Sequence, residues 1–292
     1  MEVRDSRLLP WGKRTFIMGI INITADSFSG DGILNETDVI QAAVTQAALF
    51  IEEGADILDV GGESTRPGAD FVSESAEIAR VVPVITAIRN NHPHALISID
   101  TYKAKTAAEA LNAGADWVND IWGLRGDPEM GALVAERGVP IILMHNRLKS
   151  GSAEVQDRLG GRYVGTDYDN LIQDIKNELL ACVSLAHQSG ISDGNIILDP
   201  GIGFGKTVPQ NLELLDRLDE FKALGYPLLV GPSRKSFIGY TLDLPPEERL
   251  EGTAAAVALA IDRGADIIRV HDIKAMTRVA RMADAIVRRE SR

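Results

Sequence analysis

Three polar side chains stand where a short apolar run of the sequence ends: Asp100, Asn119 and Asp199. Carboxylates accept paired hydrogen bonds from a planar group with several N–H donors, and an amide both donates and accepts along the same edge. A single aspartate in such a place is about as often a helix N-cap or half of a surface ion pair. Three together raise the hypothesis of one shared binding site.

Cationic side chains occupy comparable positions later in the chain. Lys235 precedes a helical stretch, and Arg269 and His271 are two residues apart, so their side chains project from the same face of a strand end. A guanidinium plane stacks on an aromatic ring system and also holds an anionic group. Taken alone, Lys235 is more often a solvated lysine at a helix start and His271 a structural residue. Beside the acidic residues, they supply the positive charge that an anionic ligand needs.

The glycine-rich segment 201–206, GIGFGK, has some likeness to a phosphate-binding loop. It lacks the four-residue gap before Gly-Lys-Ser/Thr that such a loop requires. Nucleotide binding is therefore discounted.

The elements that position these residues alternate between short apolar runs and longer amphipathic stretches. Apolar residues recur at helical spacing in Val39–Ile51 and Asn170–Ala186, for example. Eight β-then-α units in one chain predict a single (β/α)8 TIM barrel domain over residues 1–292, rather than an open doubly wound sheet. The expected strands are Phe16–Ile21, Asp56–Val60, Leu96–Ile99, Asp116–Asn119, Pro140–Met144, Asn195–Leu198, Pro227–Val230 and Asp266–Val270.

A short recurrence supports this reading. Gly-Ala-Asp occurs at 54–56, 114–116 and 264–266, each time where a helix should end and a strand begin. Gly138–Pro140 and Gly225–Pro227 stand at equivalent junctions. Glycine suits the left-handed position after a helix, and proline stops the helix. Chance is the alternative, but the matching junctions argue against it.

The barrel prediction places the chemistry, because the site of such a fold lies at the C-terminal ends of the strands. The unusual polar residues fall there: Asn22, Glu63–Arg66, Asp100, Asn119, His145, Asn146, Asp199, Ser233–Lys235 and Arg269–His271. The segment 147–166, rich in glycine, serine and charge, is interpreted as a loose surface excursion after the fifth strand.

Composition excludes several kinds of partner. The net charge is −12, from 30 basic and 42 acidic residues, which disfavours nucleic acid or an anionic membrane. The single cysteine, Cys182, excludes an internal disulfide, and no Cys/His cluster indicates structural zinc. The N-terminus lacks a secretory apolar segment, and no apolar run reaches the ~18 residues of a membrane helix. A cytoplasmic location is the simplest expectation.

Seven strand-end segments in order resemble the dihydropteroate synthase family, and the resemblance covers nearly the whole chain. Each segment alone is weak evidence, but the set is specific. The segments are Met18–Ser29, Gly61–Gly68, Ser98–Thr101, Val118–Asp120, Asp199–Lys206, Ser233–Phe237 and Arg269–His271. The resemblance implies a transferase of folate biosynthesis that condenses 6-hydroxymethyl-7,8-dihydropterin pyrophosphate with 4-aminobenzoate, giving 7,8-dihydropteroate and pyrophosphate.

The resemblance also implies roles for individual residues. The implied pterin-binding residues are Asp100, Asn119, Met144, Asp199, Lys235 and Arg269. The implied pyrophosphate site consists of Asn22, Arg269 and His271, with Mg²⁺ near Asn22 bridging phosphate oxygens. Two lid loops and their neighbours are assigned to the 4-aminobenzoate pocket: Thr24, Asp26, Ser27, Phe28, Thr65, Arg66, Pro67, Phe204 and Ser236. His145 is expected to be supporting rather than catalytic.

The first lid loop departs from the family pattern. Ala25 stands where the family usually has proline, and Gly30-Asp31-Gly32 where it has Asp-Gly-Gly. Proline would restrict the unliganded loop, so its loss predicts a larger ordering cost. Because sulfonamide drugs mimic 4-aminobenzoate in this family, we hypothesise reduced sulfonamide sensitivity.

Two rival functions stay open on the sequence. A pterin-binding methyltransferase barrel would share the acidic and asparagine contacts but lack the lid motifs and the segment Ser233–Phe237. A non-catalytic pterin-binding paralogue is favoured only by Ala25. The family is commonly dimeric, and the apolar stretches Thr253–Ala260 and Met276–Ile286 offer a face for a homodimer.

Overall fold

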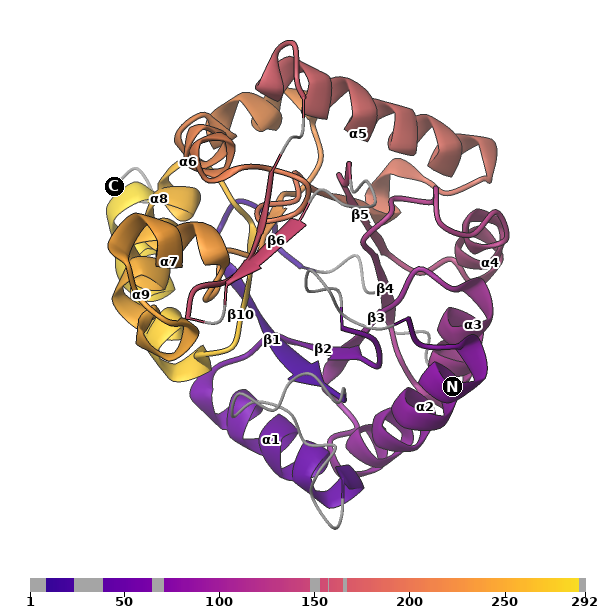
Figure 1. The fold of residues 1–292 in the computed structure, drawn as a ribbon. Coiled ribbons are helices and arrows are strands. Elements are labelled where there is room, and N and C mark those ends of the chain that lie inside the picture. The colour runs from indigo at the N-terminus through magenta and orange to yellow at the C-terminus, as the bar shows by residue number, and fades with distance from the viewer. Residues whose placement is uncertain are drawn as a thin grey trace.

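The computed structural model describes residues 9–23, 39–64, 71–147, 153–156, 158–164 and 167–288. Within them, eight parallel strands form one sheet in the order β8-β5-β4-β3-β2-β1-β10-β9. These strands are β1 (Phe16–Asn22), β2 (Ile57–Gly61), β3 (Leu96–Asp100), β4 (Trp117–Asp120), β5 (Ile141–Met144), β8 (Ile196–Asp199), β9 (Leu229–Val230) and β10 (Ile267–Val270). A parallel bridge between Leu198 and Leu228 joins the two edges. The predicted TIM barrel is confirmed (Figure 1).

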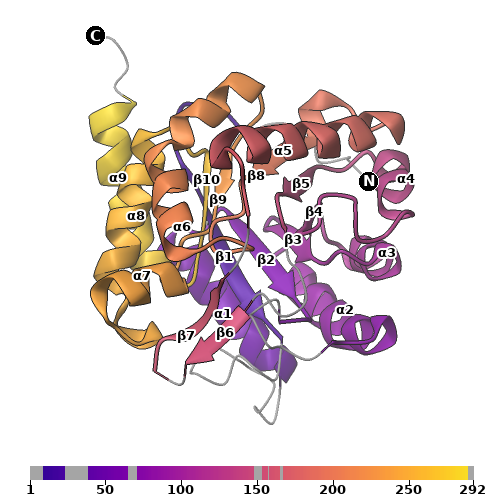
Figure 2. The ribbon, with the colours of Figure 1, turned by 45° about the horizontal axis from the view of Figure 1, so that its top comes forward.

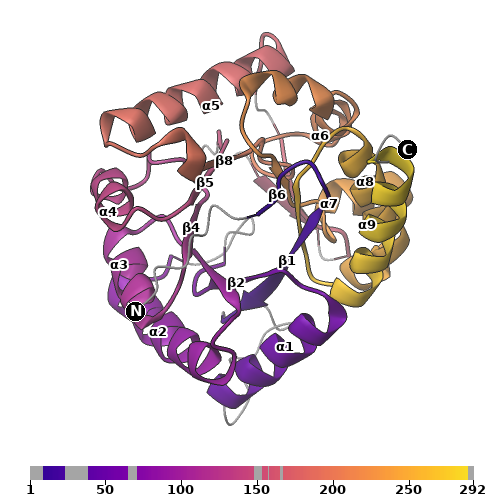
Figure 3. The same cartoon turned by 180° about the vertical axis from the view of Figure 1, so that it is seen from behind.

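Helices surround this sheet on its outer side in both axial views (Figures 1 and 3). Those described are α1 (Val39–Glu53), α2 (Glu74–Asn91), α3 (Ala104–Ala113), α4 (Met130–Arg137), α5 (Leu171–Gln188), α6 (Val208–Asp216), α7 (Ser236–Leu242), α8 (Leu250–Asp262) and α9 (Ile273–Val287). Short 3₁₀ turns lie at Asp193–Asn195, Leu218–Leu224 and Pro246–Glu248. The helices expected from periodicity, α1 and α5, both form. None of the helices in the described ranges is long and apolar enough to cross a bilayer.

The inside of the barrel has an apolar layer toward the N-terminal ends of the strands. Its buried residues form one cluster drawn from seven of the eight strands: Phe16, Met18, Ile57, Trp117, Ile142, Ile197, Leu229 and Ile267. Trp11 packs against this cluster from before β1, with its ring 5.5 Å from that of Phe16 and 6.4 Å from that of Trp117. Because side chains alternate along a strand, the residue two positions beyond each member also faces inward. The next inward layer therefore lies toward the C-terminal ends of the strands.

The recurring Gly-Ala-Asp has a common structural explanation at the opposite ends of the strands. The carboxylate of Asp56, which precedes β2, accepts the N–H of Ile17 in β1 at 2.9 Å, while its own N–H donates to the Ile17 carbonyl. Asp116 makes the same reciprocal pair with Ile97. Asp266 makes it with Leu228. The recurrence is thus a repeated lock between neighbouring strands.

The segment 147–166 differs from the expected loose excursion. Its described residues include an antiparallel hairpin of β6 (Ala153–Gln156) and β7 (Gly160–Tyr163). Leu159 and Tyr163 are buried, and Figure 2 shows the hairpin beside α7. The guanidinium of Arg249 donates to the Leu159 carbonyl at 3.0 Å, and the hydroxyl of Tyr240 donates to the Gly160 carbonyl at 3.3 Å. The interpretation as a loose excursion was therefore wrong, because distant polar contacts and burial fix the hairpin.

Candidate functional site

The strand-end residues predicted from the sequence converge at one end of the barrel. Asn22, Asp100, Met144 and Asp199 are the last residues of β1, β3, β5 and β8. Asn119 and Arg269 come one residue before the ends of β4 and β10, and His271 directly follows β10. Lys235 is the N-cap of α7 and Ser236 its first residue. The predicted lid residues Thr24, Asp26, Ser27, Phe28, Thr65, Arg66 and Pro67, and Ala25 with them, lie outside the described residues.

Arg269 is the centre of a buried charge cluster. Its Nε donates to Oδ2 of Asp59 at 2.6 Å, and its Nη2 donates to Oδ2 of Asp100 at 2.6 Å. The side-chain amide of Asn119 donates to the same Asp59 oxygen at 3.1 Å. Asp59 is 0% exposed, and its Oδ1 has no partner among the described residues. One guanidinium therefore holds two carboxylates on different strands.

Sequence reasoning missed Asp59, although a local signal existed. Asp59 lies in the apolar run Ile57–Val60, two residues after Ile57 of the inner apolar layer. The alternation of side chains in a strand points it into the barrel. A carboxylate on the inner face needs a partner, and Arg269 supplies it.

Burial shifts the acidity of this cluster. Burial raises the pKa of Asp100 to about 7, against the opposing effect of Arg269. Burial lowers the pKa of Arg269, but Asp59 and Asp100 outweigh that effect and raise it. Asp100 therefore sits near its midpoint at neutral pH, whereas Arg269 keeps its charge. A ligand that offers N–H donors would favour the ionised carboxylate.

The second acidic group, Asp199, lies at the start of the glycine-rich loop. Its Oδ1 accepts the N–H of Gly201 at 2.7 Å, and burial raises its pKa. The ammonium of Lys235 donates to the Ile202 carbonyl at 2.6 Å and lies 3.9 Å from the ring centroid of Phe204. Burial lowers the pKa of Lys235 to about 7, although Asp199 opposes the shift. These residues make one compact cationic and acidic face.

The turn that carries Lys235 is fixed from both sides. Arg234 adopts a left-handed backbone, with φ of 54°, and its guanidinium makes two hydrogen bonds to Asp272, at 3.0 and 2.6 Å. Ser233 Oγ lies 3.0 Å from Nδ1 of His271 and accepts the backbone N–H of the same residue at 3.2 Å. The turn after β9 and the end of β10 are therefore held together, with Lys235 and His271 in the same region.

The described residues offer little for a tightly held metal. No group of three or more His, Cys, Asp or Glu side chains with ligand geometry occurs in the described ranges. Asn22 ends β1 and could contribute one amide oxygen. That donor set fits Mg²⁺, which usually takes one or two protein oxygens and completes its shell with water and substrate phosphates. It does not fit a structural zinc or a calcium cage.

A second buried charge cluster joins Glu63, which the sequence placed after a strand, to Lys103 and Glu77, which sequence reasoning missed. The ammonium of Lys103 donates to Glu63 at 2.6 Å and to Glu77 at 2.7 Å. The other oxygen of Glu63 accepts the N–H of Val72 at 3.0 Å. Residues on both sides of 65–70 are thus joined through one carboxylate. Only contacts distant in sequence reveal this arrangement.

Comparison with known proteins agrees with a pterin-binding barrel enzyme. Residues 18–271 match the family described as pterin binding enzyme. A dihydropteroate synthase of Clostridium beijerinckii is 51% identical over 95% of this chain and 96% of its own length. The dihydropteroate synthase of Clostridium difficile, solved in the presence of pteroic acid, is 44% identical, with a TM-score of 0.86 over 97% of this chain and all of its own. That of Xanthomonas albilineans with 4-aminobenzoic acid is 37% identical, with a TM-score of 0.83 over 94% of each chain. The chain belongs to the dihydropteroate synthase family of pterin-binding enzymes, and so to the transferases.

Proposed function

We propose that this chain joins 6-hydroxymethyl-7,8-dihydropterin pyrophosphate to 4-aminobenzoate, forming 7,8-dihydropteroate and pyrophosphate in folate biosynthesis. The observation that carries the proposal is the polar cluster at the C-terminal mouth of the barrel, in a chain with family relatives over almost its full length. There, Asp100 and Asp199 flank the cations Arg269 and Lys235. Acidic acceptors for a donor-rich ring and cations for a pyrophosphate are both present.

The pterin is assigned to the acidic side of this cluster. Its ring carries an edge of N–H donors that suits the carboxylates of Asp100 and Asp199, with the amide of Asn119 beside them. The pterin lies over Met144, which is buried and pairs in register with Asp199. Lys235 contacts the pterin near its ring carbonyl, and Arg269 stacks on the ring face.

The pyrophosphate is assigned to Asn22, Arg269 and His271. Nη1 of Arg269 takes part in neither of the contacts to Asp59 and Asp100. It can therefore reach an anion while the other two nitrogens stay fixed. When bound, Mg²⁺ would neutralise charge on the phosphate oxygens, and Asn22 is the residue that would hold it.

The 4-aminobenzoate is assigned to the side of the mouth that carries Phe204 and Ser236. The Xanthomonas albilineans relative was solved with 4-aminobenzoic acid, which supports this substrate. Phe204 offers an apolar ring face, and Ser236 starts α7 next to Lys235. The remaining contacts are assigned to the two lid loops named in the sequence analysis.

The reaction follows from these positions. The C–O bond between the pterin methylene and the pyrophosphate breaks, and its electron pair leaves with the pyrophosphate. The pterin ring delocalises the positive charge that remains on the methylene carbon. The arylamine nitrogen then forms the C–N bond and releases a proton to solvent. Arg269 and His271 stabilise the departing charge, and binding of both substrates at close range supplies the rest.

An assay with both substrates and Mg²⁺ tests the proposal. Purified protein should form dihydropteroate and pyrophosphate in equal amounts when both substrates are present, and omission of either organic substrate should abolish dihydropteroate. Absence of condensation, together with methyl transfer in a parallel assay that supplies a methylated pterin, would indicate a methyltransferase. Pterin binding with no turnover would indicate a non-catalytic pterin-binding protein.

The proposal includes assembly as a homodimer in the cytoplasm. Leu259 of α8 and Met282 and Ile286 of α9 are 50%, 63% and 51% exposed, on two helices that pack together. A second copy of the chain would cover this apolar face. Sedimentation should give a dimer mass for the natural protein and a monomer for Met282→Glu. The lone, buried Cys182 suits a reducing compartment.

A further inference from the structure

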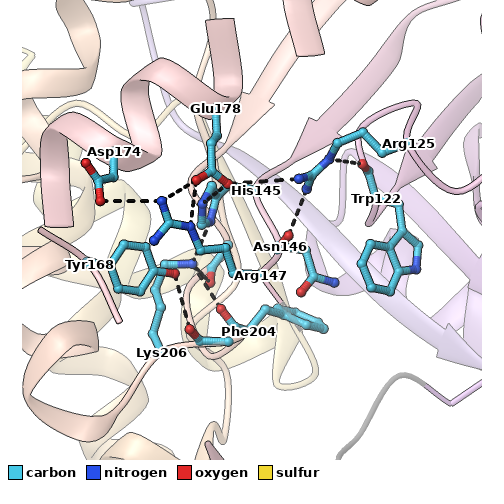
Figure 4. Close-up of polar contacts among 12 residues, drawn as sticks. Trp122, Arg125, His145, Asn146, Arg147, Tyr168, Asp174, Glu178, Phe204 and Lys206 are labelled. Atoms are coloured by element: carbon cyan, nitrogen blue, oxygen red, sulfur yellow. Dashed lines mark hydrogen bonds and ion pairs between the residues drawn. The ribbon is translucent and has the colours of Figure 1, made fainter. Parts of the chain in front are cut away.

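Lys206, at the end of the glycine-rich loop, has a side chain directed back under that loop. It is only 2% exposed. Its ammonium donates to the Gly201 carbonyl at 2.9 Å and to the Phe204 carbonyl at 3.0 Å, and lies 3.0 Å from Nδ1 of His145 (Figure 4). Three acceptors match the three N–H donors of a lysine ammonium. The group is therefore fully hydrogen-bonded although it is buried.

The charge of Lys206 lacks a close counter-ion. Among the described residues, no carboxylate oxygen lies within 4.0 Å of its nitrogen. Its pKa falls to about 7, mainly because of burial, with the nearby Lys235 acting in the same direction and Asp199 in the opposite one. Burying an ammonium against neutral acceptors destabilises the fold relative to an apolar side chain of similar size. Because its buried charge destabilises the fold, Lys206 is a candidate for a functional role in addition to packing.

The backbone of the loop is held at nearly every carbonyl. Lys206 holds those of Gly201 and Phe204, and Lys235 holds that of Ile202. The hydroxyl of Tyr168 donates to the carbonyl of Gly205 at 3.2 Å. These contacts converge because the backbone reverses direction at alternate glycines.

At two of those glycines a side chain would be strained. Gly201 has φ of 73°, and a Cβ there would overlap the carbonyl oxygen of His145. Gly203 has φ of 79°, and a Cβ there would overlap the side chain of Lys235. The repeating Gly-x-Gly-x-Gly of the sequence therefore forms a turn around an internal cation. It is not a cradle for an external phosphate.

A polar network holds His145, the side-chain acceptor of Lys206, in place. Burial lowers the pKa of His145 to about 3, so the imidazole is neutral, and its Nδ1 accepts from Lys206. Its proton then lies on Nε2, 3.1 Å from a Glu178 oxygen. Glu178 also accepts from Nε of Arg147 at 2.6 Å, and its pKa falls to about 2 because His145 and Arg147 outweigh its burial. The network anchors the loop to α5.

We propose that Lys206 is a positioning residue that sets the place of Phe204 against the arylamine substrate. The proposal rests on the proposed function, in which Phe204 forms part of the 4-aminobenzoate pocket. Lys206 donates to the backbone carbonyl of Phe204, and the ammonium of Lys235 lies over the Phe204 ring. Of the assigned pterin contacts, Asp199 and Lys235 also touch this loop, at Gly201 and Ile202. The hydrogen bonds of Lys206 go instead to His145, Gly201 and Phe204, so it acts on Phe204 directly. Loss of Lys206 should therefore affect one substrate more than the other.

The test compares Lys206→Met with Arg89→Met. Arg89 donates to the backbone carbonyls of Gly114, Pro93 and Ala95 at the opposite end of the barrel, so its loss also removes a cation from backbone acceptors. For Lys206→Met, KM for 4-aminobenzoate should rise about tenfold or more, as for a lost charged hydrogen bond. Calorimetric Kd for the pterin pyrophosphate should change by less than about twofold. Arg89→Met should lower Tm and leave both constants unchanged.

Tyr168→Phe is the milder variant if Lys206→Met does not fold. It removes one hydrogen bond from the same loop, and KM for 4-aminobenzoate should rise severalfold with no change in pterin pyrophosphate affinity. Equal changes for both substrates, or no change for either, would overturn the positioning role. A natural protein that does not turn over the two substrates would overturn the proposed function and this role with it. Turnover by the natural protein with unaltered constants in the variants would overturn the role alone.

Discussion

At the N-terminal ends of the strands, Asp56 and Asp116 each accept one backbone N–H and pair with one arginine, Arg14 or Arg89. At the C-terminal ends, Asp59 and Asp100 share the single guanidinium of Arg269. The first arrangement balances each charge locally and leaves it partly hydrated, with side-chain exposures of 50% for Arg14 and 20% for its partner. In the second arrangement two buried carboxylates share one guanidinium, so the two negative charges are not each paired with a cation of their own.

This difference distinguishes the N-terminal ends of the strands, where ion pairs stabilise the fold, from the C-terminal ends, where the charges can bind a ligand. At the mouth, burial raises the pKa of Asp100 to about 7 and lowers those of Lys206 and Lys235 to about 7. At the other end, the hydrogen bonds that Arg14 donates to Asp56 raise the pKa of Arg14 and so keep it charged. Shifted acids and bases gathered in one place are typical of a site whose charges a substrate completes.

The largest expected effect comes from Arg269→Ala. It would leave Asp59 and Asp100 buried without a cation, and breaking such a pair costs about 3–5 kcal/mol of unfolding free energy. Binding of the pterin pyrophosphate should also weaken, and more than in Lys235→Ala, because the proposed function assigns Arg269 both to the ring face and to the anion. Denaturant unfolding and calorimetry measure the two effects.

Arg89→Ala is the matched change at the other end, where Asp116 stays partly hydrated. It should cost less stability and leave pterin pyrophosphate affinity unchanged. Unaltered affinity in both Arg269→Ala and Lys235→Ala would show that the cationic site lies elsewhere.

The next effect is that of Asp199→Asn. The amide can still accept from Gly201, but its NH₂ group would then face the N–H donors of the pterin. Loss of a charged acceptor costs about 1.5–3 kcal/mol per bond, so kcat/KM should fall by one to two orders of magnitude or more in a folded protein. Asp116→Asn supplies the contrast, with lower Tm and normal kcat/KM. A folded Asp199→Asn variant with near-normal kcat/KM would place the pterin elsewhere.

The sequence was sufficient for the barrel because its signals are local. Apolar runs, helical periodicity and the glycine junctions at Gly54, Gly114 and Gly264 each act within one β-α unit, and all eight units form. The strand-end site followed from the same pattern together with the family resemblance. The roles assigned to its members stay predictions.

What the sequence did not show depends on contacts between distant residues. The β6–β7 hairpin is fixed by Arg249, which follows Leu159 by 90 positions. In the sequence, Lys206 was only the last residue of a segment that does not match the phosphate-loop motif. The fold shows that its ammonium lies inside the loop. Asp59 is the exception, since the alternation of its own strand would have placed it on the inner face.

A smaller effect concerns pH. The pKa of Lys206 is about 7 in the folded protein, against an ordinary value of 10.5. Between these values the unfolded chain binds more protons, so the unfolding free energy should rise with pH, by at most about 1.4 kcal/mol per pH unit for this group. Asp199, Lys235, Glu178 and Arg147 face it and set where the rise begins.

A partly buried cation at the N-terminal ends of the strands, Arg89, supplies the control for this pH effect. Urea unfolding from pH 7 to 10 should show a smaller slope against pH in Lys206→Met than in the natural protein. Arg89→Met should keep the natural slope, because arginine does not titrate in this range. Equal slopes in all three proteins would mean that Lys206 stays charged throughout.

The smallest effect should come from Arg14→Met, at the outermost of the aspartate locks. Arg14 makes hydrogen bonds of 2.9 and 2.6 Å to Asp56, yet half of its side chain is exposed, and exposed ion pairs contribute about 0–1 kcal/mol. Asp56 would keep its bond to the backbone of Ile17, so the strand register should not change. Unfolding free energy should fall by less than about 1 kcal/mol, and less at high salt, with KM and kcat unchanged. A loss of several kcal/mol, or any change in KM, would mean that the two ends of the barrel are coupled and that the division between a holding end and a binding end does not stand.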